Sequence, residues 1–240
     1  MHFFRSKAGM VTVAIQPLVW LTLMGNMFEK VRAIPGFPAP SYLSYMAPGI
    51  IAMTVLFGGV YSGMSVIWDR RIGFMNKMLA TPISRFSVVL GKMFSSAIRS
   101  GLQTAIILGA AVAMGVPLRT GPAGAVLLIL IAMLLCLSFA GISLAVGAAV
   151  HVHETFFAIT NFLTMPLIFT SSALFPLEFM PTWLRTAATY NPVTYAIDPI
   201  RILMISGWEW GTIIPDIIVV GLFTVGVASV STYMFRRSVV

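Results

Sequence analysis

Charged residues are scarce in this chain. Asp, Glu, Lys and Arg make up 9% of its 240 residues, whereas a soluble domain carries about 25%. Acids are the scarcer sign, with 7 Asp and Glu against 15 Lys and Arg. Hydrophobic residues reach 58%, and the mean hydropathy is +0.95. This balance excludes a soluble globular domain and indicates an integral membrane protein with a single transmembrane domain over residues 1–240.

Several chemical signatures are missing as well. The single cysteine, Cys136, lies in an apolar segment and excludes an intrachain disulfide. The phosphate-binding pattern G-x-x-x-x-G-K-[ST] does not occur, so we expect ATP to bind a partner. The spacing of His151-x-His153-Glu154 does not place two ligands on one helical face, so we expect no metal. No basic stripe carries interleaved aromatics, which argues against nucleic acid, and no catalytic cluster is visible.

Six apolar segments are long enough to span a bilayer, which takes about 20 helical residues. We therefore expect an all-α polytopic membrane protein with six transmembrane helices. Most Lys and Arg lie on the same side as the two termini, so the positive-inside rule places both termini in the cytoplasm. Gly59-x-x-x-Gly63 in the second span suits close helix packing, either within the subunit or between subunits. The expected spans are 9–28, 45–67, 94–116, 123–149, 156–175 and 212–235.

The connection 68–92, WDRRIGFMNKMLATPISRFSVVLGK, is short and strongly basic. Its apolar residues Ile72, Met75 and Leu79 recur at helical spacing, and Thr81-Pro82 ends the run. The pattern predicts a short helix that lies parallel to the membrane on its cytoplasmic side. A partner protein could bind such a helix.

The connection 175–210 is mostly apolar but is divided by proline. Its pieces are too short to span, and its Trp and Tyr residues suit the headgroup region. Asp198 and Arg201 are three residues apart, so on a helix they share a face and can pair. We expect two short helices that fold back into the outer leaflet, a re-entrant hairpin before the last span. The dividing prolines are Pro176, Pro181, Pro192 and Pro199.

Two motifs in this order resemble those of the ABC type-2 permease family, in its drug- and lipid-exporting branch. The first runs from Asp69-Arg70-Arg71-x-Gly73-Phe74 through Leu79-Ala80-Thr81-Pro82-x-Ser84-Arg85 to Leu90-Gly91-Lys92. The second runs from Phe175-Pro176-Leu177-Glu178-x-Met180-Pro181-x-Trp183-Leu184 through Asn191-Pro192-x-Thr194-Tyr195 to Asp198-x-x-Arg201. The resemblance covers nearly the whole chain, because the six-span layout is also the family's. It implies a cytoplasmic coupling helix, an outer re-entrant hairpin and a function in export.

The resemblance also implies partners and functional residues. Family members pair with a second permease, here expected to be identical, and with two cytoplasmic ABC ATPase subunits that bind Mg-ATP. The chain itself is expected to be neither an enzyme nor a cofactor-binding protein. The implied ATPase-coupling residues are Asp69, Arg70, Arg71, Gly73, Phe74, Lys77, Thr81, Pro82 and Arg85. The implied outer-hairpin residues are Pro176, Glu178, Pro181, Trp183, Asn191, Pro192, Tyr195, Asp198 and Arg201.

A charge at the bilayer centre costs at least ~2.5 kcal/mol, so it usually marks a functional site. The spans of this chain hold few polar side chains of any kind. This scarcity argues against the alternative function, an ATP-independent secondary transporter or channel. We expect contact with membrane lipid and an apolar or amphipathic substrate, such as a drug, a lipid or a lipid-linked glycan. Phe57, Phe162 and Phe169 are candidates for lining its path. The prediction is a multi-pass exporter subunit of the plasma membrane.

Overall fold

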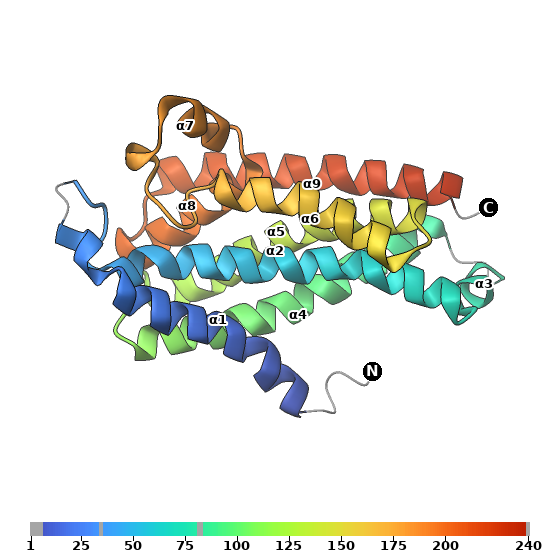
Figure 1. The fold of residues 1–240 in the computed structure, drawn as a ribbon, viewed down its shortest axis with the longest axis horizontal. Coiled ribbons are helices and arrows are strands. Elements are labelled where there is room, and N and C mark those ends of the chain that lie inside the picture. The colour runs from blue at the N-terminus through green and yellow to red at the C-terminus, as the bar shows by residue number, and fades with distance from the viewer. Residues whose placement is uncertain (1–6, 34–35, 81–83, 239–240) are drawn as a thin grey trace.

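The structure, a computed structural model, describes residues 7–33, 36–80 and 84–238. Within these ranges it is helical and contains no strand. The long helices lie side by side in one bundle (Figure 1). The α-helices are α1 Lys7–Met27, α2 Tyr42–Arg71, α3 Phe74–Leu79, α4 Arg85–Ala113, α5 Gly121–Ala149, α6 His153–Phe169, α7 Thr182–Thr189, α8 Pro192–Ile205 and α9 Trp210–Ser238, with short 3-10 helices η2 Glu29–Ala33 and η3 Leu177–Phe179.

Helix α5 is the centre of the bundle. It packs against α2, α4, α6, α8 and α9. Its sequence, GPAGAVLLILIAMLLCLSFAGISLAVGAA, contains no charged residue. A helix that is apolar all round has no face that requires water, so it suits this central position.

Glycines bring α2 and α5 into backbone contact. A Cβ atom at Gly59 would lie 2.8 Å from the carbonyl oxygen of Cys136, and one at Gly63 would lie 2.0 Å from that of Ser143. On the facing helix, a Cβ at Gly147 would lie 2.5 Å from the carbonyl oxygen of Gly63. The Gly59-x-x-x-Gly63 motif therefore serves packing within the subunit, which decides between the two uses that the sequence left open.

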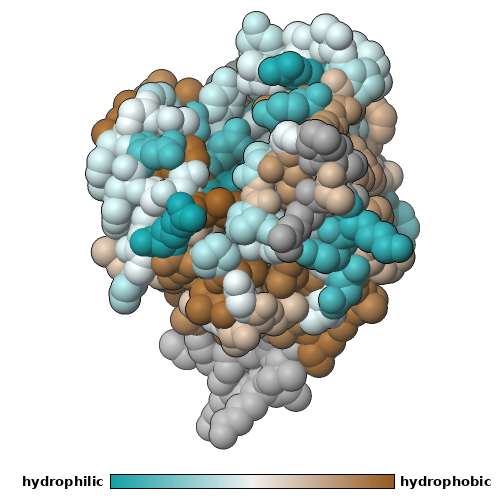
Figure 2. Space-filling view, turned by 90° about the vertical axis from the view of Figure 1, so that its left-hand side faces the viewer, coloured by the Kyte–Doolittle hydropathy of each residue, from teal (hydrophilic) through white to brown (hydrophobic). Residues whose placement is uncertain are grey.

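The bundle has two different ends (Figure 1). Helix α3 lies at one end, between the end of α2 and the start of α4, and α9 also ends there. Helices α7 and α8 lie at the opposite end, where α2 begins. We call these the α3 end and the α8 end. Figure 2 views the α8 end, where hydrophilic residues gather, while hydrophobic residues cover much of the flanks.

Among the residues that the structure describes, four helices have the length and apolar character of a membrane span, namely α2, α4, α5 and α9. They coincide with the expected spans 45–67, 94–116, 123–149 and 212–235. The other two expected spans, 9–28 and 156–175, correspond to α1 and α6, which are not in this group. Helix α6 has 17 residues. A straight helix needs about 20 residues to cross the hydrocarbon core.

Two helix ends differ from the sequence expectation, and local hydrogen bonds explain both. Helix α4 begins at Arg85, not near residue 94, because the Ser84 side chain caps it by accepting the Ser87 N–H at 3.1 Å. Helix α6 ends at Phe169, not near residue 175. After the Thr170 N–H, the bonding changes: the N–H and the hydroxyl of Ser171 both donate to the Ile168 carbonyl, at 3.2 and 2.7 Å, and the chain leaves the helix.

The flanks of the bundle are apolar. Large hydrophobic side chains such as Trp20 of α1, Phe94 of α4, Phe162 of α6 and Leu222 of α9 are exposed. An exposed apolar surface distributed over so many helices suits contact with lipid or with another apolar chain. Together with the four span-length helices, it identifies the chain as a membrane protein.

Candidate functional site

The turn that follows α6 packs directly on α2 at the α8 end. A Cβ atom at Gly49 would lie 2.1 Å from the carbonyl oxygen of Ala173, so glycine permits this approach. Close by on α2, the Tyr45 hydroxyl donates to the carbonyl of Ser172 at 3.0 Å. Because α6 ends early, the Ser172 carbonyl lies outside any helix, and the Tyr45 hydroxyl of α2 provides its hydrogen-bond donor.

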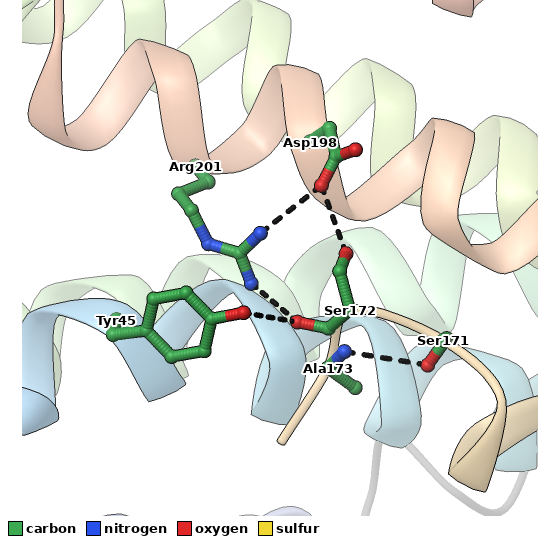
Figure 3. A network of polar contacts seen from close by, with 6 residues as sticks. All are labelled: Tyr45, Ser171, Ser172, Ala173, Asp198 and Arg201. Atoms are coloured by element: carbon green, nitrogen blue, oxygen red, sulfur yellow. Dashed lines mark hydrogen bonds and ion pairs between the residues drawn. The ribbon is translucent and has the colours of Figure 1, made fainter. Parts of the chain in front are cut away.

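Arg201 of α8 is at the centre of a polar network in this region (Figure 3). Its guanidinium donates to Asp198 Oδ1 at 3.0 Å and to the Ser172 carbonyl at 2.6 Å. The guanidinium carbon also lies 4.0 Å from the centre of the Tyr45 ring, in cation–π geometry. The Ser172 hydroxyl donates to the same Asp198 oxygen at 2.8 Å. The predicted pairing of Asp198 with Arg201 is confirmed, and the pair belongs to a network that joins α2, the turn after α6, and α8.

Asn191 fixes the start of α8. Its side-chain oxygen accepts the Val193 N–H at 2.9 Å, and Pro192 occupies the first helical turn. Its amide nitrogen donates to the Leu167 carbonyl at 2.6 Å and to the Thr170 hydroxyl at 2.9 Å. One buried asparagine therefore caps α8 and also binds the end of α6.

The remaining residues that the sequence assigned to an outer hairpin divide between interior and surface. Pro176 is buried, and Tyr195 packs half-buried against the main core. Glu178, Pro181 and Trp183 are exposed. Helix α8 packs on α2, α5 and α9, whereas α7 packs on η3. The two short helices therefore have different environments, α8 within the bundle and α7 at its surface.

At the α3 end, an ion pair joins the two spans that flank α3. The Lys92 ammonium of α4 pairs with the Asp69 carboxylate of α2 and also donates to the Ser65 hydroxyl at 2.9 Å. Both charged side chains are mostly buried, so the pair is shielded from water. It closes the base of the connection that carries α3 and holds the two spans together there.

Helix α3 presents Phe74 and Lys77 at its surface. Gly73 has φ +69°, a left-handed conformation that glycine favours, and it ends α2 and turns the chain into α3. Met75 is buried in a small core at this end and anchors the helix, whereas Phe74 is 47% exposed and Lys77 is exposed. The apolar stripe predicted for this segment is only partly correct, because Ile72 caps α2 and is 68% exposed.

Arg70 and Arg71 have different surroundings although they are adjacent. Arg70 donates to the carbonyls of Ala148 at 2.6 Å and Val150 at 3.5 Å, at the end of α5. Arg71 is exposed. Consecutive residues on a helix point about 100° apart, so only one of the two can face α5 in this way. Arg70 therefore stabilises the junction of α2 with α5.

The other residues predicted from the sequence lie in several places. Thr81-Pro82 lies outside the described residues, and Arg85 is half-buried at the start of α4. Phe57 packs half-buried against the main core, while Phe162 and Phe169 are exposed on α6. The three phenylalanines thus have different environments, and their function in substrate passage stays a prediction.

Sequence reasoning did not predict the contacts of three residues that are central here, Tyr45, Ser172 and Lys92. Tyr45 and Ser172 are 127 positions apart, so no local spacing connects them. The available signals were weak ones, a tyrosine at the start of a span and a serine pair near the end of another. Lys92 was visible as a basic residue of the connection, but its pairing with Asp69 across the loop was not.

These features together define a class of protein. It is a helical membrane protein with the short helix α3 between two span-length helices at one end and the short helices α7 and α8 at the other. The family model described as ABC-2 type transporter matches residues 1–205. The chain therefore belongs to the ABC-2 type transporter family, as its two motifs predicted.

Individual relatives agree with this membership. A protein of Cyanophora paradoxa named as a transport permease, ycf38, is 33% identical over 83% of this chain and 69% of its own length. A protein of Escherichia coli (strain K12) named as a multidrug ABC transporter permease, YbhR, is 25% identical over 84% of this chain and 55% of its own length. The daunorubicin resistance ABC transporter permease protein DrrB1 of Streptomyces coeruleorubidus is 24% identical over 85% of this chain and 71% of its own length.

Proposed function

We propose that this chain is the membrane-spanning permease subunit of an ATP-driven exporter in the plasma membrane. The α3 end and both termini face the cytoplasm, and the α8 end faces outward. The excess of Lys and Arg around α3 supports this orientation through the positive-inside rule. Relatives named for multidrug transport and for daunorubicin resistance support an outward direction and an apolar or amphipathic substrate, such as a drug, a lipid or a lipid-linked glycan.

The observation that carries the proposal is the geometry of α3. The helix lies at the end of the bundle between two spans that the Asp69–Lys92 pair joins, and Met75 fixes it to the core beneath. Phe74 and Lys77 are left at the surface. A short helix that is rigidly attached yet presents an aromatic and a cationic side chain suits the task of receiving motion from a cytoplasmic partner.

That partner would be a pair of ABC ATPase subunits, each binding Mg-ATP. The chain's membership in the ABC-2 type transporter family and relatives named as ABC transporter permeases support an ATPase on separate subunits. A second, identical permease would complete the complex. The exposed phenylalanines of α6, Phe162 and Phe169, provide apolar surface for lipid or for that second subunit. Phe57 is retained as a candidate for the substrate path.

The segment from 175 to 210 would form the outer re-entrant hairpin before the last span. Helix α8 has 14 residues, too few to cross a bilayer, yet it packs among α2, α5 and α9. Its two charged side chains, Asp198 and Arg201, pair with each other and with Ser172, which lowers the cost of burying them at membrane depth. The exposed α7 would lie at the outer interface, where Trp183 suits the headgroup region.

Coexpression of the chain with a candidate ABC ATPase subunit from the same genome tests the proposal. We expect the two proteins to copurify and transported substrate to raise the rate of ATP hydrolysis. The double variant Phe74→Ala, Lys77→Glu should keep the folded bundle, because both side chains lie at the surface, but should lose copurification or the stimulated hydrolysis. Arg70 is unsuited to this test, because its reversal would also break its bonds to α5.

The matched control is Trp183→Ala, which removes an exposed aromatic side chain from the opposite end of the molecule. It should leave copurification and the hydrolysis of ATP in detergent unchanged. Wild-type copurification and stimulated hydrolysis in the double variant would remove α3 from the ATPase contact.

A further inference from the structure

A pocket of about 550 Å³ lies at the α3 end, beside the last turn of α2. Its lining combines side chains from the end of α2 with the connection between α5 and α6. The volume falls within the range of small-ligand sites, about 300–1,000 Å³. The polar and aromatic lining residues are Trp68, Arg70, Arg71, His151, His153 and Glu154.

The charge of this lining favours an anion. The lining includes two arginines, Arg70 and Arg71, and one acid, Glu154. The bonds from Arg70 to the carbonyls of Ala148 and Val150 hold its guanidinium in a fixed position. A cation that is already oriented loses less conformational entropy when a ligand binds, which strengthens binding.

Uncapped donors add to this preference. Helix α6 begins at the pocket with Val152 as its N-cap residue, which offers no side-chain oxygen to the first N–H groups. Nε2 of His153 is buried and has no hydrogen-bond partner in the described part of the chain. The His153 ring packs edge-on against Trp68, with ring centres 5.1 Å apart. This nitrogen has almost no accessible surface and lies behind the pocket wall, so the preference for an anion rests on the two arginines and on the uncapped start of α6.

We propose that this pocket binds the phosphate of an anionic phospholipid headgroup from the leaflet at the α3 end. Phosphate accepts hydrogen bonds from arginine, imidazole and helix N–H groups alike. The apolar part of the lining, with exposed Trp68 and Val152 at its surface, suits the glycerol and the first acyl carbons of a lipid. The identification of this leaflet as the cytoplasmic one rests on the proposed function, whereas the binding itself does not.

Lipid titration of the purified full-length chain in detergent, followed by native mass spectrometry, tests the proposal. Detergent removes the diffuse attraction of a charged bilayer, so direct contacts dominate. We expect phosphatidylglycerol to bind more tightly than phosphatidylcholine. Arg71→Gln should weaken phosphatidylglycerol binding about tenfold, as the loss of one charge-assisted contact implies, without changing phosphatidylcholine binding. Arg71 is exposed, so this variant should fold.

The matched control is Arg237→Gln, which makes the same change at the same end of the molecule. Arg237 lies near the end of α9, against the Tyr233 ring and outside the pocket lining. An equal loss of binding in both variants, or no preference of the wild type for phosphatidylglycerol, would overturn the site. Displacement of the lipid by inorganic phosphate at similar concentration would overturn its assignment to a lipid. The ATPase is absent from this assay, so its outcome is independent of the transport experiment.

Discussion

Replacing Arg201 with glutamine tests whether the network at the α8 end holds α8 in place. The wild-type guanidinium makes the 3.0 Å ion pair with Asp198, the 2.6 Å bond to the Ser172 carbonyl and the contact with Tyr45. Its side chain is 14% exposed, and that of Asp198 is 32% exposed. Removing one partner of a buried ion pair costs about 3–5 kcal/mol. Because Asp198 keeps some access to solvent, we expect the lower value, about 3 kcal/mol.

The reverse change, Asp198→Asn, should cost less, about 2 kcal/mol, because Arg201 keeps its bond to the Ser172 carbonyl and its contact with Tyr45. The double variant removes both charges, so no buried charge is left without a partner. Its cost should be about 3 kcal/mol, well below the sum of the two single losses. In a chain of this size, 1 kcal/mol shifts Tm by about 2–4 °C, so Arg201→Gln should lower Tm by about 6–12 °C.

Thermal unfolding in detergent, followed by tryptophan fluorescence, measures these shifts. Arg185→Gln is the control, because Arg185 is exposed on α7 and its change should move Tm by less than about 2 °C. Strict additivity of the two single variants would refute the network. So would a Tm for Arg201→Gln equal to that of the control.

Two further predictions concern packing and topology. Gly63→Ala should destabilise the bundle by about 1–3 kcal/mol, because the new Cβ would lie 2.0 Å from the Ser143 carbonyl oxygen. The control Gly91→Ala, with open space around it, should not lower Tm. Equal Tm values for the two variants would contradict the close contact. In a cysteine-free background, a membrane-impermeant maleimide added to intact cells should label Thr186→Cys of exposed α7 but not Leu203→Cys of buried α8. Equal labelling would show that the segment is a hydrated loop.

Local and compositional features of the fold were predictable from the sequence. The uniformly apolar run of α5 and the three-residue spacing of Asp198 and Arg201 each depend on neighbours along the chain. Periodicity and composition report such features directly. The position of α3 between two spans followed in the same way from a basic connection bounded by apolar runs.

Contacts between distant segments were not predictable. Arg70 and Arg71 are equivalent in the sequence, and only the packing of α2 on α5 directs Arg70 to the carbonyls near residue 148. The same limit applies to Tyr45, whose partner Ser172 became accessible because α6 ends early. Hydropathy extended that span to residue 175, since the turn after Phe169 is as apolar as the helix before it.

Helix α2 connects the two candidate regions. At the α3 end, Asp69 joins it to α4 through Lys92, and at the α8 end Tyr45 joins it to the network of Arg201. Its 30 residues correspond to about 45 Å of helix. Between these ends, the glycine contacts of α2 with α5 leave little room for bending or sliding, since side chains cannot absorb a shift where backbones touch. In the proposed exporter, a displacement of α3 by the ATPase would therefore move α2 and α5 together, and α8, which packs on both, would move with them.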